Sequence, residues 1–231
     1  MQPVKVGVIG TGSLGFRHVQ GYQAATGVEL VGIYDLNPET QSRISAECGV
    51  HGLANAAEVI EAAEAVSVVV PSDQHYEVAR PVLEAGRHLL VEKPLTNSLA
   101  EAEELVALAS ERDLLTAVGH LEEFNPVLPL LEQVPGTPRL IRAERFAPYP
   151  PQRRPLRPRG CEVSVVLDLM IHDLDVVLTL VGADVVEIEA TGQTLISESE
   201  DIAWARLVFA NGCIAEIAAS RVNPVPSRQL F

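Results

Sequence analysis

Three short stretches of this sequence combine residue types that can perform chemistry. The motif G-x-G-x-x-G occupies residues 10–15, and the triplet Glu-Lys-Pro occupies residues 92–94. The segment DLMIHDLD, residues 168–175, spaces carboxylates and a histidine along an expected helix. Glycine-rich turns bind phosphates, while lysine, histidine and carboxylates transfer protons or orient the groups that do. The sequence therefore contains a candidate nucleotide site and candidate acid–base groups.

The glycine motif stands in the context that dinucleotide-binding proteins require. It follows an expected strand at 4–10, opens an expected helix at 13–25, and precedes a strand that ends at Asp35, 20 residues after Gly15. The first glycine permits a tight turn, the second lets the backbone approach a pyrophosphate, and the third lets the helix pack closely. A glycine turn without a ligand is the alternative. We assign cofactor binding to Gly10, Thr11, Gly12, Ser13, Leu14 and Gly15.

Asp35 bears on the choice of cofactor. A carboxylate at the end of the second strand can accept hydrogen bonds from both ribose hydroxyls of NAD, and it repels a 2′-phosphate. No arginine follows it in the segment YDLNPE. The sequence therefore predicts NAD rather than NADP.

Lys93 is one of only two lysines in the chain, and it ends the expected strand at 88–93. Ligands of parallel sheets bind at the carboxyl ends of the strands. A partly desolvated lysine there can donate a hydrogen bond to a reacting oxygen or relay its proton. Pro94 restricts the lysine to an extended backbone. The alternative is a surface lysine in a salt bridge with Glu92.

Asp168, His172 and Asp175 are spaced at i, i+4 and i+7, so they share one face of an expected helix. Asp168 can pair with an imidazole nitrogen of His172 and raise its basicity, which is the usual support for a general base. Polar residues of a helix surface are one alternative, and metal ligands are another. We expect no metal, because no further His or Cys cluster accompanies them and hydride transfer to nicotinamide requires none.

The elements that must position these residues divide the chain in two. In the first half, apolar strands alternate with helices, which predicts a parallel sheet covered on both faces. We expect an α/β fold with a Rossmann, doubly wound domain at 1–121. The expected strands are 4–10, 28–35, 65–71, 88–93 and 114–120, and the expected helices are 13–25, 37–49, one that follows 71 and runs to about 85, and 98–113.

The second half, 122–231, changes to longer strands and one long helix at 163–181. Ala210-Asn211-Gly212 is a hairpin signal between the last two strands. We therefore expect an α+β domain with a mostly antiparallel, open sheet. Its expected strands are 139–146, 185–193, 201–209 and 213–222.

Net charge and the lengths of the apolar runs argue against two classes of protein, nucleic-acid-binding proteins and membrane-spanning proteins. The net charge of −14 argues against general nucleic-acid binding, and no apolar run is long enough to span a membrane, so we expect a cytoplasmic protein. The three cysteines fit neither a disulfide framework nor a zinc pattern. Seven of the 17 basic residues lie between Arg139 and Arg159, either as a solvated loop or as an anion site, for which arginine is suited by its paired donors.

The three motifs and their order resemble those of the Gfo/Idh/MocA oxidoreductases, a group that includes glucose–fructose oxidoreductase and inositol dehydrogenase. The resemblance covers essentially the whole chain. It implies that Lys93, Asp168 and His172 line a substrate site beside the nicotinamide. It also places His75 near the cofactor, although a histidine at a helix N-terminus is the alternative. Pro71, Glu92 and Lys93 complete the expected cofactor-binding residues, and Glu92 alternatively only positions Lys93.

Residues 119–131 and 165–181 further resemble the branch of UDP-N-acetylglucosamine 3-dehydrogenases. The resemblance implies NAD-dependent oxidation of a sugar hydroxyl to a ketone, namely the 3-OH of a UDP-N-acetylhexosamine. A free polyol or monosaccharide is an alternative substrate, and a non-catalytic NAD-sensing protein is an alternative from another class. The expected substrate contacts are Lys93, Asn125, Arg153, Arg154, His172 and Asp175, with Asn125 alternatively capping a helix that begins near Pro126.

The resemblance also bears on assembly. Family members usually associate through the open face of the second sheet, so we expect a homodimer or homotetramer that forms through this sheet. They are also usually longer, which leads us to expect that the C-terminal domain is short or truncated. The expected partners are otherwise a sugar or nucleotide sugar, with no nucleic acid and no membrane.

Overall fold

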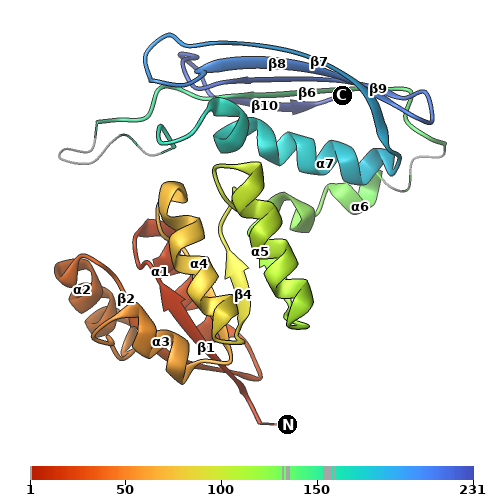
Figure 1. Cartoon of the computed structure of the whole chain (residues 1–231). Helices are drawn as coiled ribbons and strands as arrows, with labels where there is room; N and C mark the ends of the chain where they lie inside the picture. The colour runs from red at the N-terminus through yellow and green to blue at the C-terminus, as the bar shows by residue number, and fades with distance from the viewer. Residues whose placement is uncertain (1, 132, 134–135, 153–157, 159) are drawn as a thin grey trace. The chain divides into compact units, whose positions relative to one another are not determined.

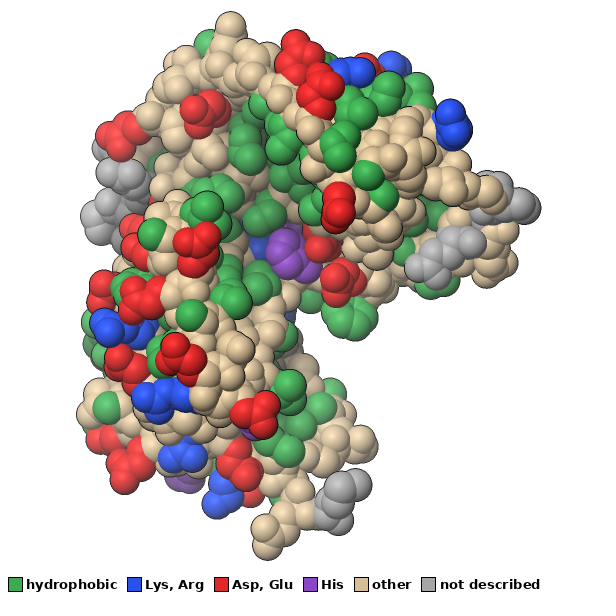
Figure 2. Space-filling model, turned by 45° about the vertical axis from the view of Figure 1, so that its right-hand side comes forward, with side chains coloured by type: hydrophobic (Ala, Val, Ile, Leu, Met, Phe, Trp, Pro, Cys, Tyr) green, Lys and Arg blue, Asp and Glu red, His purple; other side chains and the backbone are tan. Residues whose placement is uncertain are grey.

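The computed structural model describes residues 2–131, 133, 136–152, 158 and 160–231. The chain divides into two compact units, Met1–Gly119 and His120–Phe231. The division falls two residues before the boundary expected at residue 121. On the face shown in Figure 2, acidic side chains are spread over the surface with basic ones scattered among them, in keeping with the net charge of −14. No helix among the described residues is long and apolar enough to cross a membrane.

The N-terminal unit is built on a parallel five-stranded sheet in the order β2-β1-β3-β4-β5. Its strands are β1 (Val4–Ile9), β2 (Val28–Tyr34), β3 (Ala65–Val68), β4 (His88–Val91) and β5 (Thr116–Val118). Its helices are α1 (Ser13–Ala24), α2 (Pro38–Cys48), α3 (Ala56–Ala62), α4 (His75–Glu84) and α5 (Leu99–Glu111), with a 3₁₀ turn, η1 (Ser72–Gln74). The expected Rossmann class is confirmed.

Alternation along the strands places a core on each face of this sheet. Val8 packs with Val19 of α1 and Ile44 of α2 on one face. Its neighbour Ile9 belongs to the other core, which α3, α4 and α5 cover. Because successive strand residues point to opposite faces, an apolar run such as VGVI buries side chains on both sides of the sheet. This arrangement is the doubly wound fold, whose strands Figure 1 shows between the helices.

The helix ends follow local signals in the sequence. The Asn37 side chain accepts hydrogen bonds from the second and third amides of α2, and Gly49 ends that helix with a φ of 64°. The Ser98 hydroxyl accepts from the Glu101 amide to cap α5. Helix α3 was not expected from the sequence, although Asn55 caps it by accepting from the Glu58 amide at 2.9 Å. The Asn-x-x-Glu spacing was the signal that marked this helix.

The central strands are shorter than expected, because the chain leaves the sheet soon after its last ladder bonds. The Glu92 amide still donates to the Val68 carbonyl at 3.0 Å, and the Gly119 amide donates to the Val91 carbonyl at 2.8 Å. Strand β4 ends at Val91. Glu92 and Lys93 therefore lie just beyond the carboxyl end of β4 rather than within it.

The C-terminal unit contains a second five-stranded sheet in the order β10-β6-β9-β8-β7. Among the described strand pairs of this sheet, β6–β9 is parallel and the other three are antiparallel, so the expected mostly antiparallel sheet is confirmed. The expected hairpin joins β8 to β9, and Gly212 adopts a φ of 82° in its turn. The strands are β6 (Leu140–Phe146), β7 (Val185–Gln193), β8 (Ile202–Phe209), β9 (Ile214–Ser220) and β10 (Ser227–Leu230).

One helical segment covers this second sheet, and it is not uniform. The expected helix 163–181 begins as a π-helix, η3 (Val166–Met170), and continues as α7 (Ile171–Val181). Met170, Val177 and Val181 pack on one face of the sheet, along which α7 lies in Figure 1. Short elements precede β6, namely η2 (Leu121–Phe124) and α6 (Leu128–Leu131). A π-turn interrupts regular α-helical packing and is frequent at functional sites.

Candidate active site

The glycine loop of the N-terminal unit has the geometry of a phosphate cradle. Gly10 adopts a φ of 90°, and a Cβ there would lie 2.5 Å from the Val69 carbonyl oxygen. A Cβ on Gly15 would overlap the Gly10 carbonyl, so Gly15 lets α1 pack against the end of β1. Gly12 has open space where a Cβ would stand. The first and third glycines thus shape the turn, and the second leaves its backbone approachable.

The N-terminus of α1 faces this cradle. Gly12 is the N-cap residue, and it has no side chain that would occupy the place of a ligand. Helix N-terminal amides carry partial positive charge and attract anions. The loop therefore fits a pyrophosphate group on the geometry of its own backbone.

Asp35 lies beside the glycine loop, just after the end of β2. Its Oδ2 accepts hydrogen bonds from the Thr11 amide at 2.6 Å and from the Thr11 hydroxyl at 3.0 Å. Its Oδ1 accepts from the Asn37 amide at 2.9 Å. These bonds fix the carboxylate next to the loop, where the sequence analysis expected a ribose contact.

The Glu92 carboxylate anchors the turn that carries Lys93. Glu92 is 6% exposed, and its Oε1 lies 3.0 Å from Nε2 of His18. Burial raises the pKa of Glu92, but hydrogen bonds from His18 and the Lys93 amide, with the charges of both residues, bring that pKa below its ordinary value. Gly119 packs so closely on this carboxylate that a Cβ there would lie 3.0 Å from Cδ of Glu92. Glu92 therefore fixes the backbone at Lys93.

His18, which the sequence analysis missed, extends this cluster into the interior. Its Nδ1 lies 3.3 Å from the hydroxyl of Ser67, a fully buried residue of β3. The Tyr22 hydroxyl lies 2.6 Å from the same Ser67 oxygen. Burial raises the pKa of Tyr22, and the bond to Ser67 opposes that rise. The only available signal was the position of His18 on α1, three residues after Gly15.

His75 holds the other side of the Glu-Lys-Pro turn. It is 1% exposed, its Nδ1 lies 2.7 Å from the Pro94 carbonyl oxygen, and its Nε2 lies 3.0 Å from the Val70 carbonyl oxygen. The Lys93–Pro94 peptide is cis. Pro71 is exposed and immediately precedes η1. His75 thus ties the start of α4 to the turn after β4.

The N-terminal unit therefore brings most of its expected site residues to one edge. The glycine loop, Asp35, His75 and the turn at Glu92 and Lys93 follow β1, β2, β3 and β4. All these strands are parallel, so their carboxyl ends meet at the same edge of the sheet. This edge is where open α/β sheets bind ligands.

The second motif lies in the C-terminal unit at the junction of η3 and α7. Asp168 belongs to the π-segment and His172 to the first turn of α7. The Asp168 amide donates to the Ser164 carbonyl oxygen at 3.0 Å. The Asp168 carboxylate packs against Gly160, where a Cβ would overlap it. Both side chains are partly buried.

Asp175 has a partner that the sequence analysis did not identify. Its Oδ2 lies 3.8 Å from Nδ1 of His120. Burial raises the pKa of Asp175, His120 opposes that rise, and Glu123 adds to it.

The side chain of Asn125 stabilises a local turn. Its Oδ1 accepts a hydrogen bond from the Val127 amide at 3.1 Å. The turn precedes α6, which begins at Leu128 rather than near Pro126.

A buried arginine adjoins this site on α7. Arg145 of β6 is 5% exposed and donates from Nε and Nη2 to the two carboxylate oxygens of Asp173, at 2.9 Å each. Its Nη1 donates to Glu122 at 3.2 Å. The paired bonds fix the residue that follows His172 against the sheet.

Two expected contacts, Arg153 and Arg154, lie outside the described residues. Within the described part of the chain, no group of three or more His, Cys, Asp or Glu side chains is arranged to hold a metal ion. The three cysteines are free thiols, and Cys161 and Cys213 are buried.

A glycine cradle, a carboxylate after β2 and a lysine after β4 on a Rossmann sheet are together typical of nicotinamide-dependent oxidoreductases. The model of an oxidoreductase family with an NAD-binding Rossmann fold matches residues 4–120, and the model of the GFO/IDH/MocA C-terminal domain matches residues 131–231. The chain belongs to the Gfo/Idh/MocA family of oxidoreductases, and its N-terminal unit is the NAD-binding Rossmann domain.

Two named relatives of this chain are a dehydrogenase of a nucleotide sugar and a dehydrogenase of an inositol. It is 38% identical to the UDP-N-acetylglucosamine 3-dehydrogenase of Acidithiobacillus ferrooxidans over 228 residues, which cover 98% of this chain and 70% of that enzyme. A solved structure of that enzyme matches with a TM-score of 0.88 over 100% of this chain and 74% of its own. The myo-inositol 2-dehydrogenase of Thermotoga maritima is 26% identical, covering 94% of this chain and 69% of that enzyme.

Proposed function

We propose that the protein oxidises the 3-hydroxyl of a UDP-N-acetylhexosamine to a ketone with NAD as the hydride acceptor. The observation that carries this proposal is the 38% identity, over 98% of the chain, to a UDP-N-acetylglucosamine 3-dehydrogenase. The chain also carries the Glu-Lys-Pro turn, and Asp168 and His172 four residues apart. An oxidation of this kind needs a hydride acceptor, which NAD would supply, and a proton acceptor and a hydrogen-bond donor to the reacting oxygen, which these motifs would supply.

The cofactor roles follow from the described geometry. The glycine cradle and the α1 N-terminus would hold the pyrophosphate, and Asp35 would accept from the ribose hydroxyls, which favours NAD over NADP. Pro71, His75 and Glu92 belong to the turns that flank the nicotinamide end of the site in this proposal. When bound, NAD supplies the acceptor for the hydride that leaves the sugar carbon.

Three residues of this chain remove the hydroxyl proton or stabilise the charge that its removal creates. His172 removes the proton of the sugar hydroxyl, and Asp168 orients its ring and favours the protonated form that results. Lys93 donates a hydrogen bond to the same oxygen and stabilises the negative charge that develops on it. Lysine suits this role because its compact ammonium approaches a single oxygen. Asn125 and Asp175 are proposed sugar contacts.

The nucleotide part of the substrate is assigned to the arginine-rich segment. Arg153 and Arg154 carry paired donors that match a diphosphate, and we propose that they bind it. Replacing both with alanine should weaken a UDP-sugar far more than a free sugar. Equal losses for both substrates would remove the diphosphate from the proposal.

A substrate screen separates the candidates. Purified protein is mixed with NAD or NADP and with UDP-N-acetylglucosamine, N-acetylglucosamine, glucose or myo-inositol, and reduced nicotinamide is followed by its absorbance. The proposal expects turnover with the UDP-sugar and a preference for NAD. Turnover with inositol or glucose alone would favour the free-sugar enzyme, which the inositol dehydrogenase relative supports. Binding of NAD without oxidation of any sugar would favour an NAD-sensing protein.

We further propose that a second copy of this chain covers the open face of the second sheet. On this face, Leu140 of β6 is 57% exposed and Ile202 of β8 is 36% exposed, because their neighbours Ile141 and Ala203 point into the core under α7. Apolar strands that remain exposed are typical of interaction surfaces. Sedimentation of the purified protein should show a dimer or tetramer, and Leu140→Lys should shift it toward the monomer. A monomer at all concentrations would contradict this assembly.

A further inference from the structure

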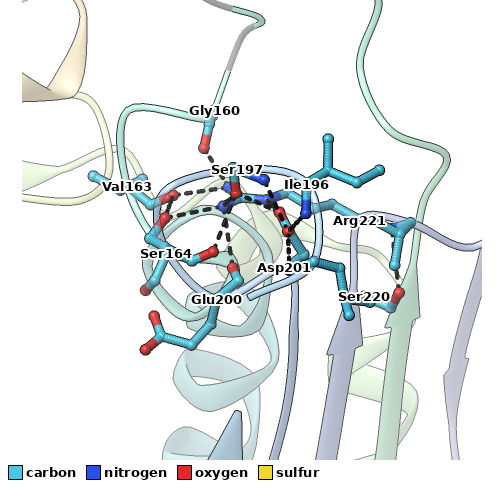
Figure 3. Close-up of polar contacts among 12 residues, drawn as sticks. Gly160, Val163, Ser164, Ile196, Ser197, Glu200, Asp201, Ser220 and Arg221 are labelled. Atoms are coloured by element: carbon cyan, nitrogen blue, oxygen red, sulfur yellow. Dashed lines mark hydrogen bonds and ion pairs between the residues drawn. The ribbon is translucent and has the colours of Figure 1, made fainter. Parts of the chain in front are cut away.

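A buried ion pair joins Arg221, just after β9, to Asp201, just before β8 (Figure 3). Arg221 is 2% exposed and Asp201 is fully buried. Nε of Arg221 donates to Oδ1 of Asp201 at 2.8 Å. Burying two charges costs free energy unless additional hydrogen bonds satisfy both groups. The remaining partners of the pair therefore show which parts of the fold it organises.

The other donors of Arg221 reach two different loops. Nη1 donates to the carbonyl oxygens of Gly160 and Val163 at 2.7 and 2.8 Å. Nη2 donates to the Ser199 hydroxyl and the Glu200 carbonyl, both at 3.1 Å. A third acceptor for Nη2 is the Ser197 hydroxyl at 2.7 Å. Arginine has five N–H donors in a fixed plane, and every nitrogen of this guanidinium is used.

Asp201 organises one of these loops, residues 195–200. Its carboxylate accepts from the backbone amides of Leu195, Ile196 and Ser197 at 2.8, 2.6 and 3.0 Å, and from the Ser197 hydroxyl. The two loops are also joined directly, because the Ser199 hydroxyl donates to the Val163 carbonyl at 3.0 Å. The ion pair thus fixes residues 160–163 and 195–200 to one another.

The loop that Arg221 fixes is the one against which Asp168 packs. Gly160 adopts a φ of 79°, and a Cβ on it would overlap the Asp168 carboxylate. The loop continues into η3, where the Ser164 carbonyl accepts from the Asp168 amide. Val165, which ends the loop, donates its amide to the Glu200 carbonyl at 2.8 Å. The position of the Asp168 carboxylate is therefore set by backbone that the ion pair holds.

We propose that Arg221 is a positioning residue, which sets the Asp168 carboxylate, and through it the His172 ring, by fixing Gly160 and Val163. This inference rests on the proposed function in assigning chemistry to Asp168 and His172. Lysine cannot replace Arg221 in this role, because an ammonium carries three donors on one atom and cannot reach three separate groups of acceptors in one plane.

The test compares Arg221→Lys with a matched control, Arg142→Lys. Arg142 also donates to a carboxylate, that of Glu216 at 3.0 and 3.1 Å, but its side chain is 54% exposed. Isotope-labelled histidine allows the ring signals to be observed by NMR, and a His172→Gln variant assigns the signal of His172. The proposal expects Arg221→Lys to move the His172 signal and Arg142→Lys to leave it in place.

Two milder variants keep the test decisive if Arg221→Lys fails to fold. Ser199→Ala removes one link to Val163, and Gly160→Ala pushes directly on the Asp168 carboxylate. Both should move the His172 signal, and each should lower kcat by up to about 100-fold while the KM for NAD stays unchanged. The NMR signal needs no turnover, so it decides the inference even if no sugar is oxidised. An unmoved His172 signal in folded Gly160→Ala and Ser199→Ala would overturn it.

Discussion

The two units support their proposed catalytic residues with buried polar clusters of different kinds. In the N-terminal unit, His18 contacts the Glu92 carboxylate next to Lys93, and Ser67 contacts the other ring nitrogen of His18. In the C-terminal unit, Arg221 and Asp201 hold the loop against which Asp168 packs. The first cluster contains a histidine beside a carboxylate, and the second contains an arginine whose donors are spread over several loops. The cluster around Arg221 therefore acts as a fixed support for the loop at 160–163.

The clusters also differ in how they are connected along the chain. The cluster around Glu92 joins turns that follow regular parallel strands, and local sequence signals mark most of them. The cluster around Arg221 joins irregular loops to a π-helix. The second cluster should therefore contribute more to stability, and the first should act mainly on the chemistry of Lys93.

The largest expected effect is on turnover. Lys93→Ala and His172→Ala should each lower kcat by about 10²- to 10⁴-fold, which is the usual contribution of a positioned proton-transfer group. NAD binding, measured by calorimetry, should stay near its wild-type strength, because the glycine cradle is untouched. Retention of most activity by either variant would remove that residue from the mechanism and leave its supporting cluster without a catalytic role.

Removing one partner of the fixed support should have the next largest effect. Asp201→Ala leaves Arg221 as an uncompensated buried charge, and it should lower the free energy of unfolding by about 3–5 kcal/mol. The matched control is Glu216→Ala, which breaks the exposed pair with Arg142 and should cost at most about 1 kcal/mol. Urea denaturation measures both. Equal losses in the two variants would show that burial does not distinguish the pairs.

A substitution in the cluster around Glu92 should lower the free energy of unfolding less than Asp201→Ala does. Glu92→Gln removes the charge but keeps the shape, so the free energy of unfolding should fall by about 1–3 kcal/mol. Because Glu92 fixes the Lys93 backbone, kcat should fall as well. Glu47→Gln, in the exposed Arg43 pair, is the control in the same unit and should change neither quantity. A stability loss without a change in kcat would make Glu92 purely structural.

Lowering the pH should reduce the contribution of both clusters to the free energy of unfolding. The reduction should be smallest near neutral pH. The amides of residues 195–197, the Ser197 hydroxyl and Arg221 outweigh burial and hold the pKa of Asp201 well below its ordinary range, and the pKa of Glu92 is also lowered. A lowered pKa stabilises the fold above the ordinary carboxyl range of about 4, and this contribution is lost as pH falls further. Denaturation midpoints measured between neutral and acid pH should fall more steeply for wild type than for Asp201→Asn.

Much of the fold follows from the sequence, because its signals are local. The glycine motif, Asp35 and the alternation of strands and helices predict the Rossmann unit, and Asn211-Gly212 predicts a hairpin. The π-segment at 166–170 does not follow, because apolar periodicity does not distinguish π from α hydrogen bonding. The cap at Asn55 was a local signal that the sequence analysis overlooked.

The supporting residues of the site are harder to predict, because their partners are distant in sequence. His18 and Glu92 are 74 residues apart, and Arg221 and Gly160 are 61 residues apart. No spacing rule connects such pairs until the fold brings them together. The motifs therefore predict Lys93, Asp168 and His172, with Glu92 beside Lys93, but they do not indicate His18 or Arg221.

The central claim is the transfer of a hydride from carbon 3 of a nucleotide sugar. The most direct test supplies UDP-N-acetylglucosamine with deuterium at carbon 3 and analyses the reduced cofactor by mass spectrometry. The account predicts that wild-type protein transfers the deuterium to NAD and that the Lys93→Ala and His172→Ala variants transfer it far more slowly. Reduced NAD that carries no deuterium, or no reduction of NAD by this sugar at all, would contradict the account.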